Sequence, residues 1–266
     1  MSGDVFFSII IAAYNAEDTI EATVRSVLSQ SFADYEIIVK DGGSQDQTLN
    51  RIPISDRIHV FSSADGGIYP GMNEGIAKAS GKYLCFLNCG DVFYDEHVLA
   101  RVFEIAAPLS DTRNILYGNY CRKEVLFKQP SQITPFYLYR TPLCHQSTFW
   151  GSAIFDELGG YDTSYRILAD YKHTLHAFFA GAPFVYCDYP ICTYLGGGAS
   201  ETDKGIKTKK AEYKRLKALY YKKSTRIRYQ TKLLLSLRGL RKLLVSDKSP
   251  LWIRRLYRRL VNKINS

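Results

Sequence analysis

The sequence predicts an α/β protein built on a mixed, mainly parallel sheet flanked by helices. Through residues 6–107, short β-branched apolar runs alternate with segments of helical periodicity. Strands separated by helices indicate βαβ units, which pair in parallel through right-handed crossovers. The 266 residues are 46% hydrophobic and 23% charged, which is an ordinary globular composition and excludes a disordered or collagen-like chain.

The elements of the first half follow from the spacing of apolar residues. The run FFSIIIAA at 6–13 is typical of a strand buried on both faces. Ile20, Val24, Val27 and Leu28 then recur at helical spacing. By the same reasoning we expect strands at 35–40, 58–61 and 82–87 and helices at about 69–79 and 96–107.

The second half follows a different pattern. Residues 113–150 contain short aromatic segments joined by Pro-containing connections, which favours antiparallel or mixed pairing there. A helix is expected at 168–180, a strand at 183–187 and a loop at 195–205. We therefore expect a catalytic domain at 1–200 and a basic helical extension at 201–266.

The charge is divided unevenly between these two parts. Residues 201–266 hold 21 Lys and Arg against four Asp and Glu, while residues 1–200 hold 14 against 22. Within the extension, residues 250–264 space apolar and basic side chains as a cationic amphipathic helix. This pattern predicts attachment to an anionic membrane surface; the alternative is a helix with a solvated basic face that packs on the body.

Cysteines and hydrophobic runs indicate the compartment. The six cysteines form no C-x-x-C pair, so we expect free thiols in a reducing compartment. The apolar run at 6–14 is too short to span a bilayer, and Asp4 precedes it. We therefore expect neither a signal peptide nor a transmembrane anchor.

Polar loops follow three of the expected strands, where open α/β sheets bind their ligands. Asn15 follows the first strand, the D-G-G turn at 41–43 the second, and Asp91 the fourth. The second and third have simpler structural explanations, because D-G-G is a common turn and Asp91 could cap the next helix. The Gly-rich segment 65–75 could pack its backbone under a ligand, but it is not a dinucleotide or P-loop motif.

Several ordered motifs together resemble family 2 glycosyltransferases, which have the GT-A fold. The resemblance covers about residues 6–195. It rests on SIIIAAYNAEDTI at 8–20, SVLSQS at 26–31, EIIVKDGGSQDQT at 36–48, DGGIYPGMNEGI at 65–76, ASGKYLCFLNCGD at 79–91, HQSTFW at 145–150 and LADY at 168–171.

The resemblance implies a role for each matching residue. Asp170 would be the general base, Asp91 would hold Mn²⁺ or Mg²⁺, and His145 and Gln146 would lie near the acceptor or the phosphates. The nucleotide-sugar would be bordered by Ala13, Tyr14, Asn15, Asp41, Gly43, Asp65, Gly67, Asn73, Asn88 and Gly90.

The chain departs from the family pattern at two places. The family's metal motif usually has aspartates at the places of Asn88 or Gly90, so only Asp91 remains from that cluster and we expect weak metal affinity. Pro70 and Gly71 replace a more usual Asp-Ala.

A zinc site at His173 and His176 is disfavoured, because two histidines on one helix are more often buried or solvated.

The implied activity is inverting transfer from a nucleotide-sugar, with UDP expected, to a hydroxyl of a polyprenyl-diphosphate-linked saccharide in bacterial surface-polysaccharide synthesis. The enzyme would be cytoplasmic and peripheral on the inner face of the membrane. Two alternatives stay open: a catalytically silent nucleotide-sugar binder, and a nucleic-acid-binding protein that uses the basic extension. The second is disfavoured, because no recognition module is present and the strand-end loops would have no role.

Overall fold

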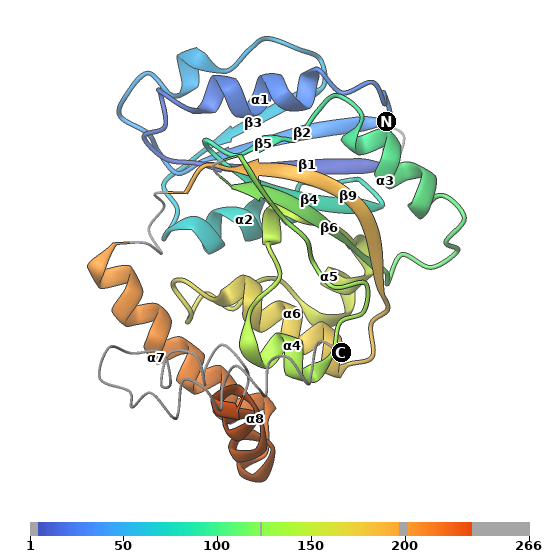
Figure 1. The fold of residues 1–266 in the computed structure, drawn as a ribbon. Helices are drawn as coiled ribbons and strands as arrows, with labels where there is room; N and C mark the ends of the chain where they lie inside the picture. The colour runs from blue at the N-terminus through green and yellow to red at the C-terminus, as the bar shows by residue number, and fades with distance from the viewer. Residues whose placement is uncertain (1–4, 123, 197–201, 236–266) are drawn as a thin grey trace. The chain divides into compact units, whose positions relative to one another are not determined.

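The computed structural model describes residues 5–122, 124–196 and 202–235. The chain divides into two compact units, Met1–Tyr213 and Lys214–Ser266. The first unit contains the sheet and the helices that cover it (Figure 1). It extends past residue 200 and includes the start of α7 (Asp203–Tyr220).

Four parallel strands form the first half of the sheet. They are β1 (Phe7–Ala13), β2 (Tyr35–Asp41), β3 (Ile58–Ser62) and β4 (Tyr83–Asn88), in the order β3-β2-β1-β4. All four lie where the apolar runs predicted them. Ala13 pairs with Asp41 and Ala12 with Asn88, so the carboxyl ends of β1, β2 and β4 meet at one edge.

The second half of the sheet is mixed, as the aromatic segments predicted. β8 (Thr148–Gly151) is antiparallel to both β4 and β6 (Ile115–Arg122), and β9 (Phe184–Tyr194) is parallel to β6. The short β5 (Val92–Phe93) pairs with β9, and β7 (Val125–Phe127) pairs with β6. β9 is longer than the predicted 183–187, because register shifts around Asn119 let its pairing with β6 continue past Pro190.

Helices cover both faces of the sheet (Figure 1). α1 (Ile20–Leu28), α2 (Ile68–Ile76), α3 (Val98–Ala106) and α6 (Ala169–Phe179) lie where they were expected. Two short helices, α4 (Pro135–Arg140) and α5 (Ser152–Leu158), were not predicted. α4 begins at Thr134, whose side chain accepts the Tyr137 N–H, and its first residue is Pro135; both features favour a helix start.

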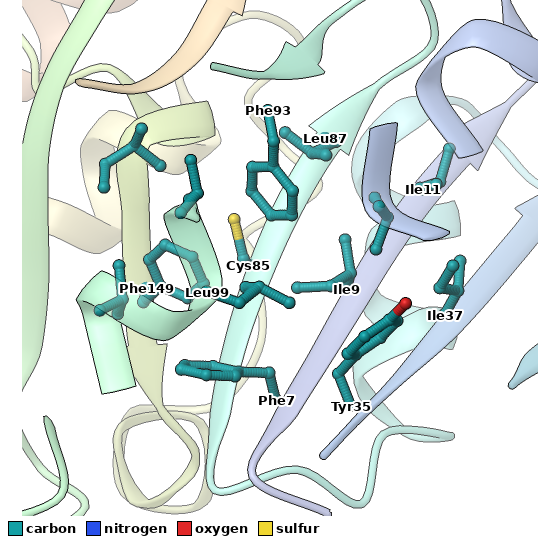
Figure 2. Packing of buried hydrophobic residues seen from close by; sticks show 14 of the residues in the cluster. Phe7, Ile9, Ile11, Tyr35, Ile37, Cys85, Leu87, Phe93, Leu99 and Phe149 are labelled. Carbon is teal, nitrogen blue, oxygen red and sulfur yellow. The ribbon is translucent and has the colours of Figure 1, made fainter. Parts of the chain in front are cut away.

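The main core lies between the sheet and helices α1 and α3. Alternate residues of the parallel strands, such as Phe7, Ile9 and Ile11, point to this face, as period-two alternation requires (Figure 2). The opposite face of β1 packs on α2, where a methyl group on Gly75 would lie 2.6 Å from Ile10 Cγ2. Both faces of the central strands are therefore buried, which explains their uninterrupted apolar sequences.

Three further expectations concern cysteines and the extension. All six cysteines are free thiols. In the extension, α7 is followed by α8 (Lys223–Leu235), whereas the helix predicted at 250–264 lies outside the described residues. None of the helices in the described ranges combines the length and apolarity needed to cross a bilayer.

Candidate active site

A cavity of about 390 Å³ opens beyond the carboxyl end of β4, beside the start of α6. Its walls bring together five of the residues singled out in the sequence, from segments far apart in the chain. These are Asn88, Asp91, His145, Gln146 and Asp170. The strand-end loops and the first turn of α6 thus converge on one space, which is the arrangement expected of an α/β ligand site.

Asp170 lies in the first turn of α6 with its side chain 16% exposed. Its Oδ1 is 2.9 Å from the Tyr69 hydroxyl, and its Oδ2 is 3.4 Å from His145 Nδ1. Burial alone would raise the pKa of Asp170, but the His145 and Tyr69 hydrogen bonds and the His145 charge outweigh it and hold the pKa below its usual value. Asp170 is therefore an ionised acceptor at neutral pH.

His145 joins Asp170 to Asn88. Burial would lower the pKa of His145, but the hydrogen bond and the charge of Asp170 outweigh it and raise the pKa. The other ring nitrogen, Nε2, is 3.2 Å from Asn88 Nδ2, and Asn88 Oδ1 is buried without a hydrogen-bond partner. A cationic His145 donates through both nitrogens, so a rotated Asn88 amide would place its oxygen against Nε2–H.

Asp91 is almost fully buried and follows Gly90, whose φ of 96° makes the turn after β4. Its Oδ2 accepts from Gln146 Nε2 at 2.7 Å, and its Oδ1 accepts from the Leu195 N–H at 3.2 Å. Burial raises the pKa of Asp91, while these two bonds and His145 oppose the rise. Gln146 and Leu195 thus orient a carboxylate at the cavity wall.

A divalent cation fits this place only with help from the substrate. Among the described residues, no group of three or more His, Cys, Asp or Glu side chains could hold a metal ion. Asp91 and the Asn88 amide oxygen, which keeps a second lone pair when it accepts from His145, are oxygen donors of the type that Mg²⁺ and Mn²⁺ accept, and Mg²⁺ commonly takes its other ligands from water and phosphates. The donor set fits a cation bridged by a bound diphosphate.

The loops after β1 and β2 are tied to each other. Asn15 donates its N–H to Ser44 Oγ at 2.8 Å, and its Oδ1 accepts the Gln45 N–H at 2.9 Å. Next to this tie, at the end of β1, the Tyr14 side chain is exposed. An aromatic ring held at a strand end by an ordered loop is available for stacking on a planar ligand group.

Asp41 has a structural task within the same loop. It is fully buried, and its carboxylate accepts from the N–H groups of Gly43 and Ser44 and from Ser62 Oγ at 2.7 Å. Burial would raise the pKa of Asp41, but these hydrogen bonds outweigh it and lower the pKa. The residue shapes the turn at Gly43, and its contact with a nucleotide base stays a prediction.

Asp65 sits over two glycines beside a buried lysine that the sequence reasoning did not single out. Lys40 Nζ donates to the carbonyl oxygens of Asp41 and Ser63 at 2.8 and 2.7 Å and lies 3.5 Å from Asp65 Oδ2. A methyl group on Gly71 would come within 2.6 Å of the same oxygen. Gly71, noted above as a departure from the family pattern, thus leaves room for the Lys40–Asp65 pair.

Of the ten residues expected to border the nucleotide-sugar, Asn88 lines this cavity and the other nine do not. Asn73 and the histidines of α6 make their contacts elsewhere. Both amide atoms of Asn73 bind the backbone of Tyr161, at 2.9 and 2.7 Å, so Asn73 connects α2 to the loop before α6. His173 is buried and stacks on Phe155 with ring centroids 4.9 Å apart, and burial lowers its pKa to about 3. His176 is exposed, so the two histidines do not face one another across a site.

The sequence reasoning missed several residues at the cavity. Tyr69 binds Asp170 directly, and three basic side chains line the walls: Arg122, Arg166 and Lys209. Tyr69 lies in the Gly-rich segment that had been singled out for its backbone. Lys209 was assigned with the rest of the extension to the membrane, because a charge run carries no information about which member faces a cavity.

A mainly parallel sheet with an ionised carboxylate, a buried carboxylate and basic side chains around one cavity beyond its strand ends is typical of an α/β group-transfer enzyme. The family model for glycosyl transferase family 2 matches residues 8–152. The chain belongs to this family and is a glycosyltransferase.

Relatives and solved structures agree with this assignment. The PGL/p-HBAD biosynthesis glycosyltransferase of Mycobacterium tuberculosis is 30% identical over 178 residues, which cover 65% of this chain and 69% of the relative. S. aureus TarS 1–349 in complex with UDP-GlcNAc superposes with a TM-score of 0.65 at 15% identity, covering 91% of this chain and 77% of that one.

The mannosyltransferase PcManGT from Pyrobaculum calidifontis, in complex with GDP-Man and Mn²⁺, has a TM-score of 0.55 at 15% identity and covers 94% of this chain and 67% of that one. Full-length TarS is longer, and this chain covers 46% of it. These structures confirm the GT-A class of fold that the resemblance implied.

Proposed function

We propose that the chain transfers a sugar, with inversion, from a nucleotide diphosphate-sugar to a hydroxyl of a lipid-linked saccharide in cell-surface polysaccharide synthesis. The observation that carries the proposal is that Asp170 is an ionised carboxylate at the cavity wall and pairs with His145. The UDP-GlcNAc bound by TarS and the biosynthetic role in the mycobacterial relative's name support the donor class and the cell-surface setting.

The chemistry needs one base on the acceptor side. Asp170 accepts the proton of the acceptor hydroxyl while the oxygen attacks the anomeric carbon from the face opposite the leaving diphosphate. Tyr69 and His145 fix the carboxylate from two directions and keep it ionised before the attack. A single displacement without a covalent intermediate inverts the anomeric centre.

The departing nucleoside diphosphate carries negative charge. Asp91 and Asn88 would hold a divalent cation against it, and such a cation supplies electrostatic stabilisation of the leaving group. Gln146 orients Asp91 for this role through its 2.7 Å hydrogen bond. Tyr14 and the loop at 41–44 would border the nucleoside, and Asp65 and Gly67 would border it from the α2 side.

The proposed setting is the inner face of the cell membrane, where the basic extension would hold the enzyme near a polyprenyl-linked acceptor. Each Lys or Arg close to an anionic surface contributes about 1 kcal/mol. The 21 basic residues at 201–266 therefore exceed what peripheral binding needs, even if only a fraction of them reach the surface.

Replacing Asp170 with Asn tests the proposal. The amide keeps the size and the Tyr69 contact but cannot take the proton, so we expect transfer to fall by about 10²- to 10⁴-fold. Donor binding, measured by titration calorimetry, should stay within a few fold. Turnover at the wild-type rate would remove Asp170 from the role of base.

The single remaining aspartate of the metal motif favours one second candidate, a sugar-nucleotide binder without turnover. Hydrolysis of a panel of sugar nucleotides with and without Mn²⁺ separates the two. Slow donor hydrolysis that depends on Mn²⁺ and on Asp91 indicates an enzyme, whereas binding without hydrolysis or transfer indicates the binder.

A further inference from the structure

One part of the cavity wall is basic. Arg122 from the end of β6, Arg166 from the loop before α6 and Lys209 from α7 line the same space as Asp91 and Asp170. All three lie in the first compact unit. Nothing in the proposed base and metal roles uses them.

The position of Lys209 is fixed by Glu212, one turn further along α7. The buried carboxylate of Glu212 accepts the backbone N–H groups of Arg166, Ile167 and Leu168 at 2.7, 3.1 and 2.9 Å. Residues three apart on a helix share a face, so this attachment turns Lys209 toward the loop that carries Arg166. Glu212 thus attaches the helix that carries Lys209 to the loop that carries Arg166, and both cations line the cavity.

The carboxylates of the cavity do not neutralise Arg166 or Lys209. Asp170 is paired with His145, and Asp91 accepts from Gln146 and Leu195. Within the described ranges, Arg166 and Lys209 form no ion pair with any Asp or Glu. Two cations at a cavity wall that already satisfies its own carboxylates favour an incoming anion.

We infer that Arg166 and Lys209 bind a phosphate-bearing group of a substrate, with Arg122 contributing from the β6 wall. The inference rests on the proposed function and adds to it the residues that recognise phosphate. Guanidinium and ammonium groups suit this ligand, because Arg forms paired hydrogen bonds with phosphate oxygens and Lys supplies a compact charge.

The phosphate has two possible sources, the donor's diphosphate and a phosphate that links the acceptor saccharide to its lipid. The first would compensate for the reduced metal motif. The second would select an anionic acceptor. Both need the same pair of cations, so the experiment has one arm for each source.

The test uses the full chain with Arg166→Gln, Lys209→Gln and the double variant. Lys210→Gln is the matched control, because Lys210 is the exposed neighbour on α7 and does not line the cavity. In the donor arm, UDP, GDP and dTDP are titrated by calorimetry. In the acceptor arm, farnesyl diphosphate is titrated in the presence of the nucleotide that wild type binds best.

We expect each single variant to weaken one of these ligands by about tenfold, equivalent to about 1.4 kcal/mol, and Lys210→Gln to change neither. Weaker nucleotide binding assigns the cations to the donor, and weaker farnesyl diphosphate binding alone assigns them to the acceptor. Equal affinities in wild type and the double variant for every probe overturn the inference. Arg166→Gln changes an exposed loop side chain, so it tests the site even if the α7 variant folds poorly.

Failure of the inference is distinguishable from failure of the proposed function. Unchanged phosphate affinities alongside normal sugar transfer by the wild type would remove only the roles of Arg166 and Lys209. The opposite result is also possible. If no donor supports transfer, but nucleotide binding is tight and weakens in the Arg166→Gln and Lys209→Gln variants, the catalytic proposal fails and the phosphate-binding inference stands.

Discussion

Asp170 and His145 form a pair in which each group shifts the protonation of the other. The pKa of Asp170 is lowered and the pKa of His145 is raised. Between these two values both groups are charged, and the carboxylate is a weaker base than it would be alone. With Asp170 as the proposed base, we expect activity to depend on pH through both members of the pair.

Replacing His145 with Gln should move the acidic limb of the pH profile. Without the hydrogen bond and charge of His145, burial is opposed only by the Tyr69 and Tyr171 hydrogen bonds, so the pKa of Asp170 rises and the carboxylate is protonated at a higher pH. We expect the acidic limb of kcat/KM to shift to higher pH, measured over pH 5–9. An unchanged limb would show that His145 does not act on the base.

The same pair makes stability depend on pH. A histidine whose pKa is raised on folding stabilises the fold fully below its unfolded value of about 6.5, and this contribution is lost as the pH rises through the folded pKa. Asp170, with a lowered pKa, contributes above its unfolded value and loses that contribution as the pH falls through the folded one.

Lys40 holds the loops after β2 and β3 together from a buried position. Its side chain is 1% exposed and is surrounded by two carbonyl oxygens, Asp65 and, at 3.4 Å, Glu74. A buried ammonium is stable only with such partners, and removing it leaves buried acceptors without a donor.

Lys40→Met should lower the free energy of unfolding by about 2–3 kcal/mol, since Met fills the volume but leaves Asp65 and the two carbonyls without their donor. Urea denaturation followed by circular dichroism measures the loss. Lys207→Met, the same change at an exposed position, is the control and should have little effect. Equal stability of both variants would contradict a structural role for Lys40.

Among the elements, the sequence predicted those that local pattern alone determines. The parallel strands and α1, α2, α3 and α6 follow from apolar periodicity. The helices α4 and α5 do not, because Pro135–Arg140 and Ser152–Leu158 are short and their aromatic side chains suit strands equally well. Thr134 and Pro135 mark the start of α4 locally, but a segment this short also depends on its tertiary contacts to form a helix.

The residues of the candidate site also fall into those that the sequence predicted correctly and those whose contacts it could not reveal. Asp91, His145, Gln146 and Asp170 were found through motif resemblance, and the structure brings them to one cavity. Asp41 and Asn73 match the motifs equally well, yet their polar atoms bind neighbouring loops. A motif identifies a side chain but does not reveal whether its atoms are directed at a ligand or at the backbone.

The contact between α2 and β1 leads to a prediction about packing. Gly75 lies against Ile10, and an added methyl would approach Cγ2 to 2.6 Å. Gly75→Ala gains about 1 kcal/mol of helix propensity, but overpacking costs about 1–3 kcal/mol. We expect a net loss, seen as a lower thermal midpoint. Gly66→Ala, where the nearest atom is Pro70 Cγ at 3.6 Å, is the control and should keep the wild-type midpoint.

Across the entire chain, the positive charge is concentrated at the C-terminal end. Residues 236–266 alone carry nine Lys and Arg against one Asp. In the structure, Lys209 and Glu212 at the start of the basic region belong to the first compact unit. We therefore expect the segment proposed to bind the membrane to begin after them.

Removing residues 236–266 should weaken binding to vesicles that contain phosphatidylglycerol by at least tenfold, because nine of the 21 basic residues of the extension are lost together with the apolar residues of 250–264. Cosedimentation measures the change, with phosphatidylcholine vesicles as the control for non-specific attachment. Nucleotide affinity should not change. Full retention on anionic vesicles, or binding of the intact chain to nucleic acid alone, would contradict membrane attachment through this segment.

The attachment of α7 to the loop before α6 has an evolutionary consequence. Glu212 recognises three main-chain N–H groups at residues 166–168, so it places no demand on the side chains there. Position 166 can accept almost any residue except proline while the helix stays attached. Replacing Arg166 with a neutral or acidic residue would therefore cost little folding stability. Related enzymes could change the charge of the ligand that they bind through this one position, so substrate preference can diverge at this loop.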